Sequence, residues 1–305
     1  MSISLGVDIG GSHITAGWVD LEKAVVIEDT IKRTLIDSQA SADRIVSGWC
    51  HLLQSAMQDR LHDNIKIGIA MPGPFDYAEG ISLMKEQDKF KALYGLNVRS
   101  LLSQGLSLPP GNFSFVNDAE SYLQGEVLGG AGKGFSDVLG LTLGTGLGSA
   151  IHSQGRTSDA DLWKMPFKEG IAEDYLSTRW FVKRYCTLAG KQEAGLKEIL
   201  ADGNAAILPK LFAEFGQNFC DFLVLLLETY DFTAVVLGGN ISQSHAHFFP
   251  VVKRLLSRQG INISVRLGML QEEATLIGAA CQWRVGLPER KQHIVEQFSS
   301  TTGNK

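Results

Sequence analysis

A glycine-rich hairpin that occurs twice constrains this chain more than any other part of its sequence. Residues 139–151 read LGLTLGTGLGSAI, in which apolar residues alternate into a glycine-rich corner and resume directly after it. This pattern predicts a strand, a tight turn and a second strand. Residues 5–17 read LGVDIGGSHITAG and repeat the design, with Gly6 at the position of Gly140. The repetition predicts two related halves that grip one polyphosphate between them.

The turns of both hairpins are suited to phosphate groups. Glycine has no Cβ atom, so the N–H groups of a glycine-rich turn approach a ligand closely and form a nest for an anion. Thr145 adds a hydroxyl group at the tip of the second turn. The candidate contacts of a polyphosphate in the two turns are Asp8, Gly10, Gly11, Ser12, Gly144, Thr145 and Gly146.

Simpler interpretations compete with the phosphate site. A lone glycine hairpin is most often only a turn, and Asp8 is either a turn-forming residue or a carboxylate that orients Mg²⁺ or its water shell. Residues 127–135 lack the first glycine and the hydroxyl residue of a Walker loop. Residues 149–151 continue a strand where a dinucleotide fingerprint would open a helix. The repeated hairpin and the carboxylate of Asp8 favour the phosphate site.

Composition and charge limit the class of protein. A chain of 305 residues with 44% hydrophobic and 20% charged residues is long enough for two globular domains. The formal net charge of −5, without a basic stretch, argues against nucleic acid as a partner. The longest apolar run, residues 222–227, is too short to span a membrane, and the N-terminus lacks a signal-peptide pattern, so we expect a cytoplasmic protein. The four cysteines form no CxxC pair, which predicts free thiols.

Polar residues follow two predicted strands of the first half, at the strand ends where open α/β sheets bind ligands. Strand 65–70 leads to a rigid turn around Gly73, and strand 112–116 leads to Asn117 and Asp118. An Asn-Asp pair before a helix is typical of an N-cap. A carboxylate at this place is also suited to accept a proton from a substrate hydroxyl group, and the two roles are compatible.

The second half has three comparable stretches. The polar, irregular residues 153–166 suit a ligand-binding loop, and residues 173–188 predict one helix with an aromatic side. Strand 232–237 ends in small residues that form either a simple turn or a surface for a flat ring or a ribose. These residues are Gly238, Gly239 and Asn240.

At this point the sequence resembles the ROK family (repressor, open reading frame, kinase), which includes many bacterial glucokinases and N-acetylhexosamine kinases. The resemblance covers nearly the whole chain, and its motifs occur in the family's order. DIGGS at 8–12 and LGTGLG at 143–148 are similar to the two phosphate motifs, and VLGGNIS at 236–242 to the adenosine motif. MPGPFD at 71–76 is similar to the sugar-side loop, and VNDAE at 116–120 to the motif of the catalytic base.

The resemblance implies an α/β fold of the actin/hexokinase type, with two ribonuclease-H-like domains and a central cleft. Residues 1–117 would form the smaller domain and residues 118–305 the larger one, with the C-terminal segment free to pack back on the first. The implied activity is a glucokinase-like, ATP-dependent phosphorylation of a hexose or hexose derivative, usually at the 6-hydroxyl, with Mg²⁺. Asp118 would be the general base, Asn117 and Gly73 would lie beside the sugar, and the protein would be a homodimer.

The chain departs from the family around its sugar loop. The usual Cys-x-Cys-Gly-x-x-Gly-Cys-x-Glu zinc site is missing, because no cysteine lies between Cys50 and Cys186, and we expect no zinc site. Glu173 matches the glutamate of that pattern, which contacts sugar in the family. Asp161 and Lys164 align with a Glu and a His of the sugar site, so we assign them to substrate binding. The alternative is that these two residues form a surface ion pair that touches no substrate.

Two functions of different classes are compatible with these residues. The first is an active sugar kinase that uses ATP and Mg²⁺, with Asp8 holding the metal through water. The second is a sugar-sensing or scaffold protein that retains the ROK fold and has little catalysis. The persistence of Asp8, Asp118 and both phosphate hairpins favours the enzyme.

Overall fold

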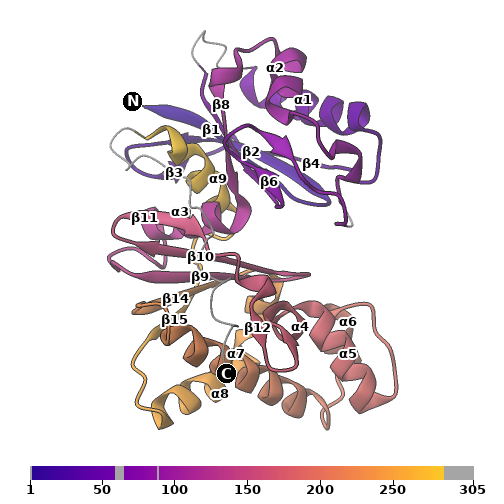
Figure 1. Ribbon diagram of the computed structural model, residues 1–305, viewed down its shortest axis with the longest axis vertical. Helices are drawn as coiled ribbons and strands as arrows, with labels where there is room; N and C mark the ends of the chain where they lie inside the picture. The colour runs from indigo at the N-terminus through magenta and orange to yellow at the C-terminus, as the bar shows by residue number, and fades with distance from the viewer. Residues whose placement is uncertain (1, 59–64, 88, 285–305) are drawn as a thin grey trace, which may run out of the picture.

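The computed structural model describes residues 2–58, 65–87 and 89–284, and Figure 1 shows them as two lobes, each built around a β-sheet. The first sheet has the strand order β3-β2-β1-β5-β8, with β4 paired to β2, and the second has the order β11-β10-β9-β14-β15. In each sheet an antiparallel hairpin is followed along the chain by two parallel strands. The two sheets therefore share one connectivity, in agreement with the repeat found in the sequence.

The strands of the described residues form two large and two small sheets. Those of the first sheet are β1 (Ile3–Ile9), β2 (His13–Asp20), β3 (Val25–Val26), β4 (Lys32–Leu35), β5 (Ile67–Met71) and β8 (Phe113–Asn117). Those of the second sheet are β9 (Val138–Leu143), β10 (Leu147–Ser153), β11 (Arg156–Asp159), β14 (Ala234–Gly238) and β15 (Ser264–Leu267). Two short hairpins are β6 (Phe75–Asp76) with β7 (Ile81–Ser82), and β12 (Pro166–Phe167) with β13 (Gly170–Ile171). The strand–turn–strand predictions at β1–β2 and β9–β10 are confirmed, whereas the loop predicted at 153–166 contains β11.

Two helices, α3 (Asp118–Gly129) and α9 (Glu272–Ala280), each follow a strand of one sheet and pack on the other sheet. Helix α3 follows β8 of the first sheet and packs on β9 and β10 of the second. Helix α9 follows β15 of the second sheet and packs on β1 and β5 of the first. The two helices also pack against each other at the centre of the molecule (Figure 1). We propose to divide the chain between Asn117 and Asp118; residues 285–305 of the second part lie outside the described residues.

Glycines allow these helices to approach their neighbours closely. A Cβ atom at Gly6 would overlap the carbonyl oxygen of Leu276 in α9, and one at Gly140 would lie 2.9 Å from the side chain of Leu123 in α3. The equivalence of Gly6 and Gly140 thus has a physical cause, since each glycine lets a helix lie against a sheet. A Cβ atom at Gly278 of α9 would in turn overlap the carbonyl oxygen of Ser121 in α3.

A buried carboxylate fixes the segment that leads into α9. The side chain of Glu126, in α3, accepts hydrogen bonds from the backbone N–H groups of Met269 and Leu270 at 3.1 and 2.8 Å. It also accepts one from Ala131, just beyond the end of α3, at 2.7 Å. Because an unpaired buried carboxylate is costly, these bonds hold the segment before α9 against α3.

The remaining helices cover the outer faces of the sheets. The helix predicted at 173–188 is two helices, because the backbone at Ser177 is extended (φ −125°, ψ 170°). Phenylalanines of α5, α7 and α8 form much of the buried core of the second lobe. Among the described residues, no helix has both the length and the apolarity to cross a membrane. The helices are α1 (Ala42–Met57), α2 (Val98–Leu106), α4 (Ala172–Leu176), α5 (Thr178–Ala189), α6 (Leu196–Asp202), α7 (Leu208–Leu227) and α8 (His245–Arg258).

Candidate active site

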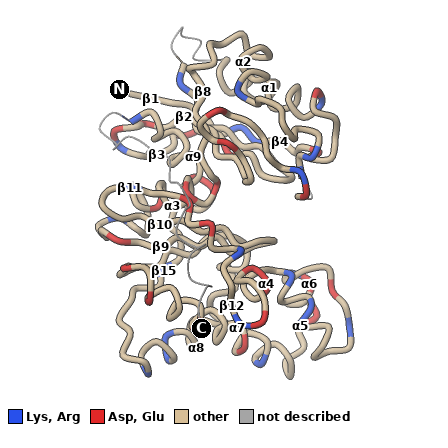
Figure 2. The backbone as a smooth tube through the Cα atoms, in the orientation of Figure 1, with Lys and Arg blue, Asp and Glu red and all other residues tan. Residues whose placement is uncertain are grey.

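Asp8 lies at the end of β1, opposite Thr15 of β2 and beside Ala70 of β5. The pKa of its carboxyl group is raised from 3.8 to about 7, mainly by burial and in addition by the neighbouring carboxylates of Asp118 and Glu272. Asp118 is far from Asp8 in sequence, so this electrostatic coupling shows that the fold brings the two candidate carboxylates together. Figure 2 shows acidic residues where α3 begins, between the two lobes.

The surroundings of Asp8 fit a divalent cation. Carboxylates that share a poorly hydrated site repel one another, and a bound cation relieves this repulsion. Mg²⁺ is usually held by one or two carboxylates, with water and substrate phosphates as its other ligands. Within the described part of the chain, no three His, Cys, Asp or Glu residues are grouped so that they could hold a metal ion by themselves. A magnesium ion at Asp8 would thus depend on the phosphates and on water.

The raised pKa of Asp8 leads to a prediction about stability. Since the folded-state pKa is about 7 against 3.8 normally, the folded protein keeps a proton that the unfolded chain loses as the pH rises above 4. The contribution of this group to stability therefore falls between about pH 4 and pH 7. In EDTA, we expect Asp8→Asn to raise the Tm at pH 8 and to leave it nearly unchanged at pH 4, as measured by circular dichroism. A lower Tm of the variant at pH 8 would contradict the assignment.

The residues of the first turn bond mainly to one another. The N–H of Gly10 donates to the carbonyl oxygen of His13 at 2.9 Å, and Ser12 Oγ lies 2.8 Å from His13 Nδ1. A Cβ atom at Gly11 would lie 3.5 Å from Cδ of Lys89, a residue that the sequence did not single out. The turn is therefore closed by the bond from Gly10 to His13, and the side chain of Lys89 packs over it at Gly11.

Asn117 and Asp118 divide two roles between them. Asn117 is the N-cap of α3, and its Oδ1 accepts hydrogen bonds from the N–H groups of Ala119 and Glu120 at 2.8 and 3.1 Å. Its Nδ2 donates to the hydroxyl of Tyr77 at 3.2 Å. The predicted cap is confirmed, and it is made by Asn117. One oxygen of Asp118, Oδ1, accepts from Ala119 at 2.8 Å, which leaves Oδ2 without a recorded partner in the described residues.

Tyr77 joins the turn after β5 to this cap. Its hydroxyl donates to the carbonyl oxygen of Met71 at 3.0 Å. Burial, followed by the charge of Asp118, raises the pKa of this phenol well above its usual value, so it remains a hydrogen-bond donor. The position of a Cβ atom on Gly73 would be 3.4 Å from the same hydroxyl. The predicted Gly73 turn and the Asn117–Asp118 pair are therefore adjacent.

The turn of the second hairpin is held by the segment around α4 and α5. The carbonyl oxygen of Gly144 accepts hydrogen bonds from the N–H and the hydroxyl of Thr178 at 2.8 and 2.9 Å. Glu173 Oε2 accepts from the N–H of Leu147 at 2.9 Å, and its other oxygen pairs with Arg179. A Cβ atom at Gly146 would lie 2.6 Å from Glu173 Oε2, so a larger residue there would displace this carboxylate. Glu173, expected at the sugar, contacts the second glycine hairpin.

Asp161 and Lys164 form the ion pair that was one of the two alternatives for them. Asp161 has a left-handed backbone (φ 50°), and Lys164 Nζ pairs with its Oδ2 while 39% of the Asp161 side chain and 56% of the Lys164 side chain stay exposed. The N–H of Asp161 donates to Asp159 Oδ1 at 2.9 Å. The ion pair leaves both side chains accessible, and their contact with a substrate stays a prediction.

Asp159, at the end of β11, is a candidate that the sequence analysis missed. Desolvation raises the pKa of its carboxyl group to about 6, and the charges of Asp161, Asp118 and Glu120 act in the same direction. The carboxyl group of Asp159 therefore lies near both the loop of Asp161 and the proposed general base, Asp118. Its signal in the sequence was a carboxylate at the end of a strand, hidden in a stretch predicted to be irregular.

Gly238 and Gly239 have a structural need for glycine. A Cβ atom at Gly238 would lie 2.5 Å from the ring of Tyr122, and Gly239 has a positive φ of 79° next to the carbonyl group of Leu143. These contacts support the interpretation of residues 238–240 as a simple turn. Asn240 opens a short 3-10 helix and is exposed, so a contact with adenosine stays a prediction.

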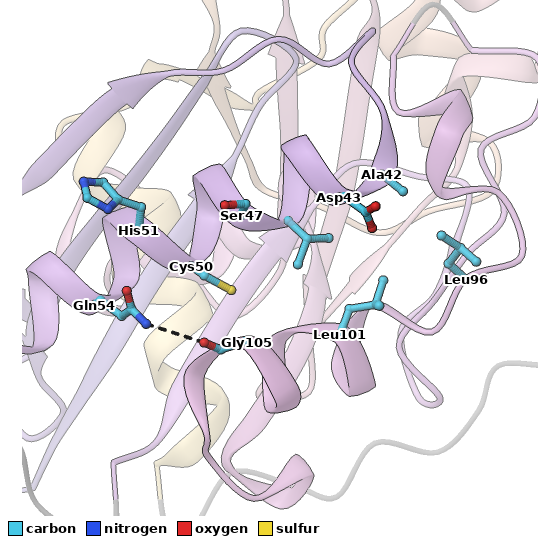
Figure 3. A pocket seen from close by; sticks show the side chains of 10 residues that line it. Ala42, Asp43, Ser47, Cys50, His51, Gln54, Leu96, Leu101 and Gly105 are labelled. Atoms are coloured by element: carbon cyan, nitrogen blue, oxygen red, sulfur yellow. Dashed lines mark hydrogen bonds between the residues drawn. The ribbon is translucent and has the colours of Figure 1, made fainter.

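A hollow in the first lobe lies apart from these residues. It has a volume of about 410 Å³ and lies between α1 and α2 (Figure 3). Gln54 Nε2 donates to the carbonyl oxygen of Gly105 across it, at 3.5 Å. Burial raises the pKa of the Cys50 thiol in its wall, which disfavours a reactive thiolate. None of the candidate residues lines this hollow.

Comparisons with known proteins define the family. The sequence model of the ROK family matches residues 4–159. A beta-glucoside kinase of Listeria monocytogenes is 24% identical over 306 residues, which cover 94% of this chain and 98% of that protein. The structure of a ROK family glucokinase from Streptomyces griseus, in complex with glucose and AMPPNP, superposes with a TM-score of 0.71 at 23% identity, covering 92% of this chain and 99% of that one.

A ROK family transcriptional regulator, described as a homolog of the E. coli MLC protein, has the same fold. It superposes with a TM-score of 0.71 at 17% identity and covers 92% of this chain and 77% of its own. Together with the two repeated sheets, these similarities establish the actin/hexokinase-like fold of two ribonuclease-H-like halves. The chain belongs to the ROK family.

Proposed function

We propose that this protein transfers the γ-phosphoryl group of ATP to a hydroxyl group of a hexose or hexose derivative, with the 6-hydroxyl as the expected acceptor. The observation that carries this proposal is the coupling of Asp8 and Asp118 between two glycine hairpins. Full-length similarity to a protein named as a beta-glucoside kinase supports a kinase, as does the fold shared with a glucokinase bound to glucose and AMPPNP.

The residues have distinct roles in this proposal. The N–H groups at the tips of the two turns hold the phosphates, because those of Gly10 and Gly144 donate to His13 and Gly146 within their own hairpins. Asp118 accepts the proton of the sugar hydroxyl group. Asn117 keeps α3 and hence Asp118 in place through its N-cap. When bound, Mg²⁺ supplies charge neutralisation at the phosphates, with Asp8 holding it through water. Phosphoryl transfer depends mainly on such positioning and charge, so little covalent chemistry is required of the protein.

A coupled assay of ADP formation with MgATP and a panel of hexoses, amino sugars, acidic sugars and β-glucosides tests this proposal. We expect sugar-dependent ADP formation, with the phosphate on the 6-hydroxyl of the product by ³¹P NMR. Sugar binding by calorimetry without any turnover would instead favour a sugar sensor. That alternative has its own support, because a transcriptional regulator shares the fold and the sugar loop has diverged.

Lys164 is proposed to contribute to the choice of sugar. Lysine offers only donors and a full positive charge, so it favours a sugar with more acceptor groups than unmodified glucose. We expect Lys164→Ala to lower kcat/KM for the best sugar about tenfold or more, with KM for ATP nearly unchanged. Lys197→Ala, at an exposed position of α6, is the control. If the sugar profile of Lys164→Ala is that of the parent and glucose is the parent's best substrate, the ion pair has no substrate role.

A further inference from the structure

Two cationic side chains, Arg33 and Lys89, are close enough to Asp8 to oppose the rise of its pKa. They differ in what else they contact. Arg33, in β4, forms an ion pair with Glu272 at the start of α9. For Lys89, the described part of the chain provides no carboxylate at ion-pair distance. Lys89 therefore keeps its charge available beside the first phosphate turn.

The stem of Lys89 lies over that turn. A Cβ atom on Gly11 would be 3.5 Å from Lys89 Cδ, an ordinary van der Waals distance, and Lys89 is half-buried. Lysine commonly packs its aliphatic stem on a surface and keeps its ammonium group at the edge. The turn itself, residues 10–13, contains no lysine or arginine. Lys89 thus brings a cation to backbone N–H groups that lack a charged residue of their own.

The next residue, Phe90, fixes the backbone of Lys89. Phe90 is fully buried and has a left-handed conformation (φ 57°). Its N–H donates to the carbonyl oxygen of Ser38 at 2.8 Å, and its ring packs edge-to-face on Trp49 with centroids 5.4 Å apart. These contacts anchor the backbone next to Lys89, so the first turn stays within reach of its side chain.

We propose that Lys89 contacts the phosphoryl group that is transferred, as a phosphate-binding residue of the active site. The inference rests on the proposed function and adds a residue from a segment that is distant in the sequence from both hairpins. A cation held close to Asp8 and to the first turn offsets charge on the phosphoryl oxygens as the bond to the leaving group breaks. A lysine serves as a point charge for this purpose.

Binding measurements separate this role from a general effect on the protein. We expect Lys89→Ala to weaken the binding of AMPPNP about tenfold or more, and that of ADP by less than about twofold, in calorimetry with Mg²⁺. Lys85→Ala is the matched control, because Lys85 belongs to the same segment but its Nζ lies 5.8 Å from the ring centroid of Tyr94. Equal weakening of both nucleotides, or no change in either, would overturn the proposal.

Kinetics give a second test. The kcat of Lys89→Ala should fall at least about a hundredfold while KM for the sugar changes little, and Lys89→Arg should recover a part of the loss. If Lys89→Ala has a lowered Tm, Lys89→Arg and Lys89→Met decide, because both keep a long stem over Gly11. If the parent protein phosphorylates sugars and Lys89→Met retains more than a third of its kcat, the role of Lys89 is refuted. The proposed function is not affected by that result. A parent protein that binds AMPPNP but phosphorylates no sugar would refute the proposed function and leave the nucleotide test of Lys89 in force.

Discussion

Asp118→Asn should lower kcat at least about a hundredfold and leave the fold and ATP binding intact. The amide group cannot accept the proton of the sugar hydroxyl, whereas its oxygen can still accept the N–H of Ala119. The N-cap of α3 is made by Asn117, so the start of the helix does not depend on the substituted side chain. Stopped assays with MgATP and the best sugar give kcat, and calorimetry with ATP gives binding.

The control for this experiment is Asp43→Asn. Asp43 is likewise an acidic residue in the first turn of a helix, but it lies in α1, on the wall of the hollow in Figure 3. We expect its variant to retain the kcat of the parent. Retention of more than about a tenth of the kcat in Asp118→Asn would show that Asp118 is not the general base.

Gly278→Ala should destabilise the protein by about 3 kcal/mol, the upper part of the range for overpacked sites. The added methyl group would overlap the backbone carbonyl oxygen of Ser121, and a backbone atom of a packed helix cannot move aside as a side chain can. The same shift would stretch the hydrogen bond of 2.8 Å from Ser121 Oγ to the carbonyl oxygen of Thr275. Urea denaturation at pH 7.5 gives the free energy of unfolding.

We expect Gly48→Ala to have the opposite effect on the free energy of unfolding in the same assay. Gly48 lies inside α1, and a Cβ atom there would meet no other atom within 4 Å. Replacing it by alanine should raise stability by about 0.5–1 kcal/mol, because alanine has the higher helix propensity. If Gly278→Ala is as stable as the parent, the close packing of α3 on α9 does not contribute as described.

The repeated hairpins could be predicted because their signal is local. Alternating apolar residues that lead into glycines define β1–β2 and β9–β10 within about a dozen residues each, and both hairpins form where expected. Asn117 and Asp118 were found for the same reason, since a strand end and a helix start adjoin in the sequence. The helix predicted at 173–188 failed at Ser177, because Thr178 bonds to the distant Gly144.

The rest of the candidate site depends on contacts between segments far apart in the chain. Asp159 is a candidate because the charges of Asp118 and Asp161 raise the pKa of its carboxyl group, and no pattern around residue 159 reports that proximity. Glu272 and Lys89 reach Asp8 from α9 and from the segment before Phe90. Glu173 matches the glutamate of the family pattern and was expected at the sugar, yet its carboxylate accepts a hydrogen bond from the N–H of Leu147 in the second hairpin. Such partners follow from packing, which the sequence does not display.

The exchange of α3 and α9 between the sheets has a consequence for how the chain is made. During synthesis the strands of the first sheet leave the ribosome early, but the helix that covers their glycine face around Gly6 and Gly68 is translated only after the strands of the second sheet. Until then this apolar face is open to solvent, a state in which nascent chains recruit chaperones or aggregate. We therefore expect the N-terminal half not to complete its native packing as an independent unit. We expect the first sheet to reach its native packing once residue 280 has been released and α9 has joined α3.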